Sequence, residues 1–459
     1  MNGRQTVIFR TKCLFLIVYI FAVLVGCTMV EEPKELVKRP AIAEEKKRIE
    51  QMVTKFLSPM DALSKTIRDE NEDSIIAKDL DGDGKEEWMI LYKKGNADNR
   101  YGIVVVKEMQ GSWKEVYRTE DSGIGIDFVS FSHVTGDRMV ETIIGWDKGS
   151  DYAKKLKGFT FKEGSVIQFI DLYYRDIAVD DLDGDGAAEL IIMNKEVEKD
   201  GISLEVLKYR DDGSADVARI AFDNGSPHYQ MKIGNATAER KGIFIDFFID
   251  AHSGYTDLLI LEKDGLKEVF ENEKRGQYMT YQYYPVGSMD RNRDGIMEIG
   301  LLTRPRGTED MELIEVPWIT TWYQWNGKNG LVPVEREYAN YFEDYIIQIP
   351  WSWGEEFTIR ETFYEETNTR KIDFFTMHKD RRLKRHIFSI QAFSVEDWTT
   401  KIEDEAYARS VILSQNPEKV VVGILPSRST EPKKFFIDKE RLRELFKSIS
   451  YEKNGQTSS

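Results

Sequence analysis

Cysteine and histidine are scarce in this chain of 459 residues, which has two cysteines and five histidines. The histidines show no H-E-x-x-H run and no paired ligand spacing, so zinc catalysis has no support. A G-x-S-x-G elbow, which would present a serine nucleophile, is also missing. The sequence therefore offers no familiar zinc or serine-elbow centre.

Positive charge is also in short supply. Lysine and arginine number 64 against 80 aspartates and glutamates, which gives a formal net charge of -16. Binding to nucleic acid or to anionic lipid needs clustered lysine and arginine side chains that neutralise phosphates. The acidic composition disfavours both partners, and we expect no nucleic acid ligand.

The first 26 residues have the pattern of a signal peptide, with Arg4, Arg10 and Lys12 ahead of an apolar run over 14–25. A transmembrane anchor is the alternative, but the run is short for a bilayer span of roughly 20 residues. The run ends in Leu-Val-Gly-Cys, which resembles the lipobox of bacterial lipoproteins. That resemblance implies a lipid on Cys27 and a membrane-anchored protein of the bacterial cell envelope, exposed outside the cytoplasm.

Neither cysteine has a free thiol in the anchored protein, because Cys13 is removed with the signal peptide and Cys27 carries the lipid. No disulfide then remains for the exported chain. Residues 27–59 are predicted to form a charged tether followed by a packing helix over 41–57, which Pro59 ends. Stability must come from core burial and, if metal binds, from the metal.

Three acidic loops of the same spacing begin at Asp79, Asp181 and Asp290. Positions 1, 3 and 5 carry carboxylate or amide oxygens, position 7 offers a backbone carbonyl and position 9 is a glutamate. Oxygen ligands at this density suit Ca²⁺, and Gly184 and Gly186 permit the tight turn. The predicted ligands are Asp79, Asp81, Asp83, Lys85, Glu87, Asp181, Asp183, Asp185, Ala187, Glu189, Asp290, Asn292, Asp294, Ile296 and Glu298.

An EF-hand is the competing interpretation, but it needs a bidentate glutamate at position 12. Position 12 is instead Ile90, Ile192 or Leu301, and each loop continues into an apolar, strand-like run. The loops therefore join strands of β-hairpins. At these residues the chain resembles the FG-GAP (VCBS, integrin-α-like) repeat, which implies a β-propeller with up to three structural Ca²⁺ ions.

The loop starts are 102 and 109 residues apart, which suggests a repeat of roughly 50 to 55 residues. A degenerate copy from His133 to Glu141 lacks the acids at positions 1 and 3, so we expect no metal at its Asp137. Five four-stranded units over 60–338 predict a five-bladed propeller, the alternatives being six or seven blades. Strands are predicted over 101–109, 113–118, 158–162, 166–173, 204–209, 215–222, 255–262, 266–270, 319–325 and 330–336.

The repeat stops near Ala339, so 339–459 is predicted to be a smaller α+β sandwich domain. Its strands are expected over 345–350, 357–361, 371–377, 385–393 and 419–425, with helices over 403–413 and after an Asp438 cap. The Ile-Pro-Trp-Ser-Trp run at 349–353 resembles the strand ends of PsbP-like sandwich domains.

These features predict a calcium-binding surface lipoprotein that acts as a non-catalytic binding or adhesion module for polysaccharide or protein. Tyrosines over 278–284 and tryptophans over 318–325 are candidates for stacking on sugar rings, although blade cores also use such residues. The alternative is an envelope-associated hydrolase or lyase on a propeller scaffold. A cleft with convergent titratable residues away from the acidic loops would favour that alternative.

Overall fold

The computed structural model describes residues 41–69, 73–97, 99–137, 139–149, 154–162, 164–196, 201–210, 212–222, 228–250, 253–270, 279–365, 369–377, 383–426 and 432–449. The predicted signal peptide over 1–26, Cys27 and the start of the tether lie outside the described residues. The lipid anchor therefore stays a prediction. No helix in the described part of the chain combines the length and apolarity needed to cross a bilayer.

Five antiparallel sheets follow one another along the chain. The first contains β1 (Ala62–Leu63), β2 (Ile75–Lys78), β3 (Glu87–Lys93), β4 (Arg100–Met109) and β5 (Ser112–Ser122). The second contains β6 (Gly125–Ser132), β7 (Glu141–Asp147), β8 (Lys154–Lys162) and β9 (Ser165–Tyr174). The third contains β10 (Asp176–Asp180), β11 (Glu189–Lys195), β12 (Ile202–Tyr209) and β13 (Ala215–Phe222).

The fourth sheet contains β14 (His228–Thr237), β15 (Arg240–Asp250), β16 (Ser253–Glu262) and β17 (Gly265–Glu268). The fifth contains β18 (Ile299–Thr303), β19 (Ile319–Trp325), β20 (Leu331–Asn340), β21 (Tyr345–Gln348) and β27 (Phe446–Ser448). Each of the ten strands predicted for the repeat array corresponds to a strand of these sheets. The mainly β architecture of successive antiparallel sheets is confirmed.

Both faces of the middle strands are buried, which explains their nearly continuous apolar runs. In β3, Met89 and Leu91 pack toward the second sheet, whereas Ile90 and Tyr92 pack on the opposite face. Separate hydrophobic cores of this kind join the second sheet to the third, the third to the fourth and the fourth to the fifth. The chain is thus a stack of sheets in which each sheet contacts the next.

The outer face of the first sheet is covered by helix α2 (Ala41–Phe56). Met52 and Leu57, at the end of this segment, are buried against Ile90, Tyr92 and Val104. The packing helix predicted before Pro59 is therefore confirmed, and it closes one end of the stack.

The other end of the stack is covered by a sixth sheet of β22 (Phe357–Tyr364), β23 (Thr369–Met377), β24 (Leu383–Ser394), β26 (Lys419–Ile424) and β25 (Ser410–Gln415). One core contains Ile319, Tyr338 and Ile347 of the fifth sheet together with Phe374 and Phe388 of the sixth. The two sheets therefore share their apolar interior.

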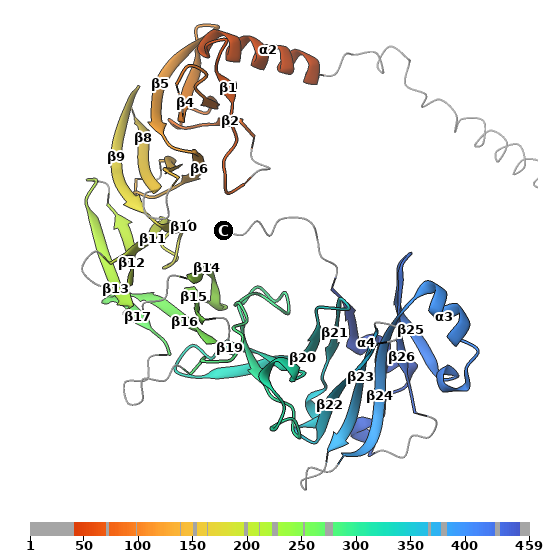
Figure 1. Cartoon of the computed structure of the whole chain (residues 1–459). Coiled ribbons are helices and arrows are strands. Elements are labelled where there is room, and N and C mark those ends of the chain that lie inside the picture. Colours follow the sequence, from red (N-terminus) through yellow and green to blue (C-terminus); the bar gives the residue numbers. More distant parts are fainter. Residues whose placement is uncertain are drawn as a thin grey trace, which may run out of the picture.

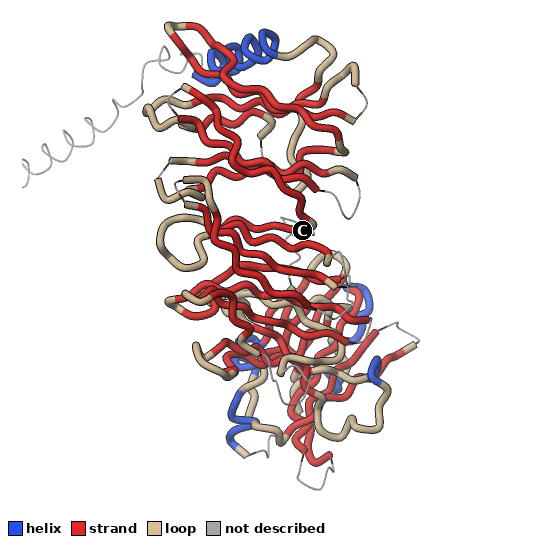
Figure 2. The backbone as a smooth tube through the Cα atoms, turned by 90° about the vertical axis from the view of Figure 1, so that its left-hand side faces the viewer, coloured by secondary structure: helices blue, strands red, loops and turns tan. Residues whose placement is uncertain are grey.

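The sheets lie in order along an open arc, with α2 and the first sheet at one end and the sixth sheet at the other (Figure 1). Figure 2 shows the same sheets from the side, one above another. This arrangement differs from the closed five-bladed ring predicted above. Closure would require the exposed faces of the first and fifth sheets to pack together. Instead α2 covers the first and the sixth sheet covers the fifth, so each terminal sheet is already buried, as in capped repeat arrays.

The pairing also corrects the content of the predicted C-terminal domain. Strand β21, expected within 339–459, pairs with β20 in the fifth sheet, and β27 from near the C-terminus pairs with β21. The apolar core crosses residue 339 for the same reason.

Helices in the last 120 residues are short. The helix predicted over 403–413 is wrong. Helix α3 (Val395–Lys401) ends before this segment, which contains a 3-10 turn η3 (Glu405–Tyr407) and the start of β25, because 410–415 pair with β26. Helix α4 (Lys439–Leu445) is confirmed, with the Asp438 side chain accepting a hydrogen bond from the Arg441 amide. Further 3-10 turns are η1 (Leu313–Glu315), η2 (Trp351–Trp353) and η4 (Lys433–Phe435).

Candidate metal sites and an aromatic cleft

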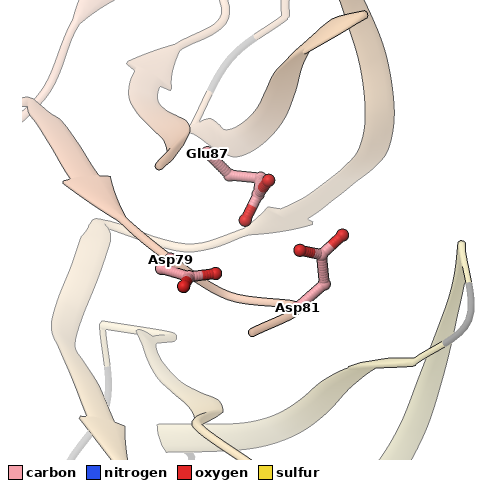
Figure 3. Close-up of side chains that lie close together, drawn as sticks. All are labelled: Asp79, Asp81 and Glu87. Atoms are coloured by element: carbon pink, nitrogen blue, oxygen red, sulfur yellow. The ribbon is translucent and has the colours of Figure 1, made fainter. Parts of the chain in front are cut away.

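The three acidic loops occupy the same place in three sheets, directly before β3, β11 and β18. In each loop three carboxylates converge, with one oxygen from each lying within 4.8 Å of the others. Figure 3 shows this convergence for the loop that begins at Asp79. The converging groups are Asp79, Asp81 and Glu87; Asp181, Asp183 and Glu189; and Asp290, Asp294 and Glu298.

The first aspartate of each loop holds the turn together. Both carboxylate oxygens of Asp181 accept backbone amides, from Gly184 at 2.7 Å and from Gly186 at 3.0 Å. These glycines have φ of 77° and 94°, values that disfavour other residues. Asp79 accepts the amides of Gly82 and Gly84 in the same way. The loop shape is thus specified by its own hydrogen bonds.

The glutamate at position 9 is buried in every loop and clamps the backbone. Its Oε2 accepts the amide of the second loop residue, at 2.8 Å for Leu80 and Leu182 and at 2.5 Å for Arg291. Burial raises the pKa of Glu189 and of Glu298. Oε1 of each glutamate is contacted by a side chain of a neighbouring strand.

A residue on the neighbouring strand reaches into each loop from the position across from this glutamate. Trp88 pairs with Val106, so Glu87 lies across from Lys107 in β4. The Lys107 Nζ forms ion pairs with Asp81, with Asp83 Oδ2 at 2.9 Å and with Glu87 Oε1 at 2.9 Å. Although burial alone would lower the pKa of Lys107, hydrogen bonds to these carboxylates raise it.

The loop at 181 repeats the arrangement with Lys208 in β12. Its Nζ contacts Asp183, lies 2.6 Å from Asp185 Oδ2 and lies 3.3 Å from Glu189 Oε1. The hydrogen bond from Lys208 lowers the pKa of Asp185. The lysine side chain is about one-third exposed, whereas that of Lys107 is only 13% exposed.

The loop at 290 has a neutral residue in this position. Gln324 of β19 donates from Nε2 to Asp294 Oδ2 at 2.8 Å and to Glu298 Oε1 at 2.7 Å. The nearby cation Arg291 is directed away from the loop and pairs with Glu337 at 2.7 Å. This loop therefore has an all-oxygen carboxylate set without an ammonium group at its centre.

The degenerate loop keeps the clamp without the converging acids. Glu141 Oε2 accepts the Val134 amide at 2.7 Å, and its Oε1 accepts the Thr135 hydroxyl at 2.7 Å. Asp137 is held by the Thr135 hydroxyl and the Met139 amide. The clamp therefore supports the hairpin turn by itself.

Some of the predicted ligands converge on one point in their loop, and the others make hydrogen bonds within the loop. Positions 1 and 9 converge in all three loops, joined by position 3 in the first two and by position 5 in the third. At position 7, the amides of Lys85, Ala187 and Ile296 donate to the loop aspartate at position 5, each at 2.9 Å. Asn292 donates its side-chain amide to Asp294 at 3.0 Å.

Sequence reasoning missed Lys107, Lys208 and Gln324. Each ends or interrupts an apolar run 19 to 26 residues after the glutamate that it faces. Only the hairpin register shows that these polar side chains lie opposite the glutamates, and that register depends on turn lengths.

A second candidate site is a cleft of about 580 Å³ between the fifth sheet and the edge of the sixth. Its walls carry aromatic rings, among them Tyr341 and Phe342, which are 65% and 59% exposed. The Trp318 ring packs against Tyr283 and Tyr284 at centroid distances of 6.1 and 6.3 Å. Other lining residues include Pro285, Val316, Pro317, Thr320, Tyr338, Asn340, Glu361 and Arg370.

The charged groups of this cleft come from the sixth sheet. Arg370 pairs with Glu361, and its guanidinium lies 4.6 Å from the Phe342 ring centre. Among the described residues that line the cleft, Glu361 is the only one with a carboxylate. The cleft thus combines apolar faces with one carboxylate and one guanidinium that form an ion pair with each other.

Ser389, His386 and Asp373 also lie together, but they do not form a catalytic triad. The Ser389 hydroxyl donates directly to Asp373 Oδ1, and His386 Nε2 lies 2.6 Å from the Ser389 Oγ. Ser389 is completely buried, so no substrate reaches its hydroxyl. Burial would raise the pKa of Asp373, yet hydrogen bonds from His386 and Ser389 lower it to about 2.

No family model and no curated protein matches the chain. Among solved structures, a protein from Lactobacillus plantarum has 9% identity and a TM-score of 0.29, with 68% of this chain and 89% of that chain covered. The exotype rhamnogalacturonan lyase YesX has 12% identity and a TM-score of 0.28, covering 67% of this chain. This chain spans 60% of the length of that lyase.

The rhamnogalacturonan lyase PL11 of Bacillus licheniformis has 12% identity and a TM-score of 0.28, with coverages of 76% and 84%. TM-scores this low do not establish that the proteins share a fold. The architecture therefore rests on the strand pairing of this chain, and its function on its own sites.

Proposed function

We propose that this chain is a lipid-anchored bacterial surface protein whose propeller-like sheet array is a non-catalytic binding module for polysaccharide. The observation that carries the proposal is the aromatic cleft between the fifth and sixth sheets. Calcium, bound at one or more of the acidic loops, has a structural role. The lipobox at Cys27 supports the anchor.

The cleft has the chemistry that sugar recognition requires. A pyranose ring presents C–H faces that pack on aromatic rings and a rim of hydroxyls that needs hydrogen-bond partners. Trp318, Tyr341 and Phe342 supply the rings, while Asn340, Glu361 and Arg370 supply polar atoms at the same opening. An open cleft of this size accommodates part of an extended chain.

Binding is favoured over glycoside hydrolysis by the count of acids in the cleft. Glycosidases generally place two carboxylates on either side of the scissile bond. In the part of the chain that the structure describes, the lining has one carboxylate, that of Glu361, and Arg370 holds it in an ion pair. A single carboxylate does not supply the pair that such hydrolysis generally uses.

The loops have the hard oxygen donors that Ca²⁺ prefers. They lie at the ends of buried hairpins, so an ion bound there would brace the sheets rather than meet a substrate. The cleft lies elsewhere, at the fifth and sixth sheets.

A glycan array with the detergent-purified chain, followed by calorimetry on the glycans that bind, tests the proposal. Trp318→Ala and Phe342→Ala should each weaken binding by about tenfold or more, since aromatic anchors often contribute more than about 1.4 kcal/mol. Trp351→Ala is the matched control, because Trp351 is half exposed and lies outside the cleft lining. Absence of any glycan ligand, or equal losses in all three variants, would contradict it.

The same samples separate binding from catalysis. Incubation of the bound glycan with the wild-type chain should release no shorter products in chromatography. The anchor is tested independently by detergent partitioning: Cys27→Ser should move the protein to the aqueous phase, and unchanged partitioning would remove the lipid from the proposal.

A further inference from the structure

The residue that faces the glutamate at position 9 differs among the three acidic loops. It is Lys107 in the first, Lys208 in the second and Gln324 in the third. Each side chain comes from the strand after the outgoing strand of its hairpin, at the register position across from the glutamate. The loops share their spacing and their glutamate clamp, so this facing residue is one of the main differences among them.

We infer that the ammonium groups of Lys107 and Lys208 are built-in cations that take the place of calcium in the first two loops. The inference rests on the proposed calcium role only for the third loop, where Gln324 leaves the cation position without a positive charge. The predicted three calcium sites are thereby reduced to one.

The distances carry the inference. Nζ of Lys107 contacts three carboxylates at once, two of them at 2.9 Å, and these include Asp81 and Glu87, which are two of the three converging acids. A divalent ion ligated by the same oxygens would lie within a few ångströms of the ammonium. Like charges at that separation repel each other.

Because Lys107 is the more buried of the two lysines, it is less able than Lys208 to leave its loop and make room for an ion. The Lys107 side chain is 13% exposed, so it cannot swing into solvent without leaving its enclosed position, whereas Lys208 is 31% exposed. Removing either lysine would leave four carboxylates in the loop, and a divalent cation would then offset part of their charge. The first loop has Asp79, Asp81, Asp83 and Glu87, and the second has Asp181, Asp183, Asp185 and Glu189.

The third loop differs in charge as well. Asn292 replaces one aspartate, which leaves three carboxylates, and Gln324 offers a neutral amide that can rotate its oxygen toward an ion. Arg291 is committed to Glu337. Calcium at this loop therefore meets no positive group at its centre.

Calorimetric titration of the detergent-purified full chain with calcium chloride, after chelator treatment, tests the inference. The wild type should bind one calcium ion. Lys107→Gln and Lys208→Gln copy the residue of the third loop, and each should gain one ion, while the double variant should gain two. Gln324→Lys makes the reverse change and should remove the wild-type site.

Lys162→Gln is the matched control, because Lys162 carries the same charge, is half exposed and lies 3.5 Å from Asp137 of the degenerate loop. It should change no stoichiometry. Circular dichroism in calcium confirms that each variant is folded; if Lys107→Gln unfolds, the more exposed Lys208→Gln still decides.

Three ions in the wild type, or no gain in folded Lys→Gln variants, would overturn the inference. Three wild-type ions would leave the proposed calcium role intact. No wild-type ion with a gain in the lysine variants would support the built-in cations and remove native calcium from the proposed function.

Discussion

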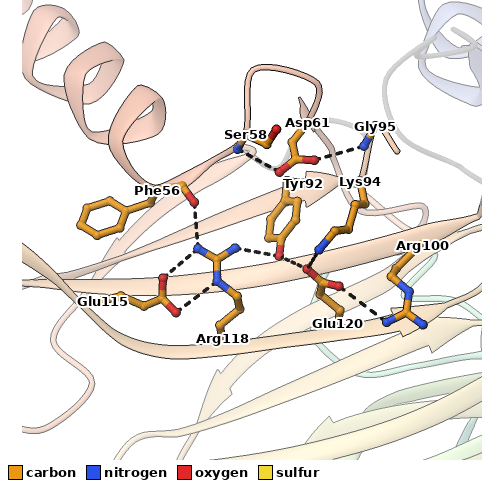
Figure 4. A network of polar contacts seen from close by, with 10 residues as sticks. All are labelled: Phe56, Ser58, Asp61, Tyr92, Lys94, Gly95, Arg100, Glu115, Arg118 and Glu120. Atoms are coloured by element: carbon orange, nitrogen blue, oxygen red, sulfur yellow. Dashed lines mark hydrogen bonds and ion pairs between the residues drawn. The ribbon is translucent and has the colours of Figure 1, made fainter. Parts of the chain in front are cut away.

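The guanidinium of Arg118 donates a hydrogen bond of 2.8 Å from Nη2 to the carbonyl oxygen of Phe56, the last residue of α2 (Figure 4). Carbonyls at a helix C-terminus lack partners within the helix and attract cations. Arg118 also donates to the Tyr92 hydroxyl at 2.9 Å and pairs with Glu115. One side chain of β5 thus fixes the end of the helix that covers the first sheet.

Arg118→Met should loosen this cover. The variant keeps a long apolar stem but removes the donors, and a lost hydrogen bond of this kind costs about 1 to 3 kcal/mol. Hydrogen exchange should therefore speed up over 41–57, more than in the fourth sheet. Arg210→Met is the control, because Arg210 and Asp216 are a highly exposed pair that contributes little to stability. Equal exchange in the two variants would show that Arg118 does not hold the helix.

The fifth and sixth sheets should resist separation by protease. Their shared core and the pairing of β27 with β21 connect both sides of residue 339. Limited proteolysis should then leave a C-terminal region attached to the fifth sheet rather than release a stable piece of about 120 residues. Mass spectrometry of the digest is the measurement, and accumulation of a folded 339–459 fragment would contradict the shared core.

Asp373 should stabilise the folded chain at neutral pH, and this contribution should be lost as the pH is lowered into the acid range. Its pKa is depressed from 3.8 to about 2 in the folded chain. A depressed carboxyl pKa stabilises the fold above the unfolded value of 3.8, and this stabilisation is lost as the pH falls through about 2. The shift corresponds to about 2 kcal/mol.

Urea denaturation of wild type and Asp373→Asn at several pH values measures this contribution. The two unfolding free energies should differ by about 2 kcal/mol at pH 7 and approach each other near pH 2. A difference that stays constant with pH would mean that the lost hydrogen bonds, and not the charge, set the effect.

Much of the sheet array was predictable because its strands are buried on both faces. Runs such as 89–92 and 190–193 are apolar at every position and are bounded by acidic turns, so their extent follows from the sequence. The acidic residues that converge in the loops were predictable for a related reason, since a fixed spacing within one turn determines which side chains meet.

Features that depend on distant contacts were not predictable in this way. The residues over 403–413 resemble a helix locally, yet 410–415 form an edge strand because β26 offers a partner. The open arc depends on what covers its two ends, and the role of Lys107 depends on strand register. Neither follows from the local pattern of a single segment.

Calcium should stabilise the chain modestly, through the third loop. Extracellular calcium sites commonly bind with dissociation constants of about 10⁻⁴ M or weaker. One such site at about 1 mM free calcium adds about 1.4 kcal/mol to the free energy of unfolding, whereas three would add about 4 kcal/mol. Free energies of unfolding measured by urea denaturation, with calcium and with chelator, should therefore differ by about 1.4 kcal/mol rather than about 4 kcal/mol.

Aspartate variants assign that difference to a loop. Asp294→Ala removes a carboxylate that faces Glu298 in the third loop and should abolish the calcium response. Asp137→Ala removes a carboxylate of the degenerate loop, which lacks a converging cluster in the described residues, and should leave the response unchanged. Because both variants lose one aspartate from a hairpin turn, their comparison separates ion binding from turn stability. A calcium response that survives Asp294→Ala would place the ion at another loop.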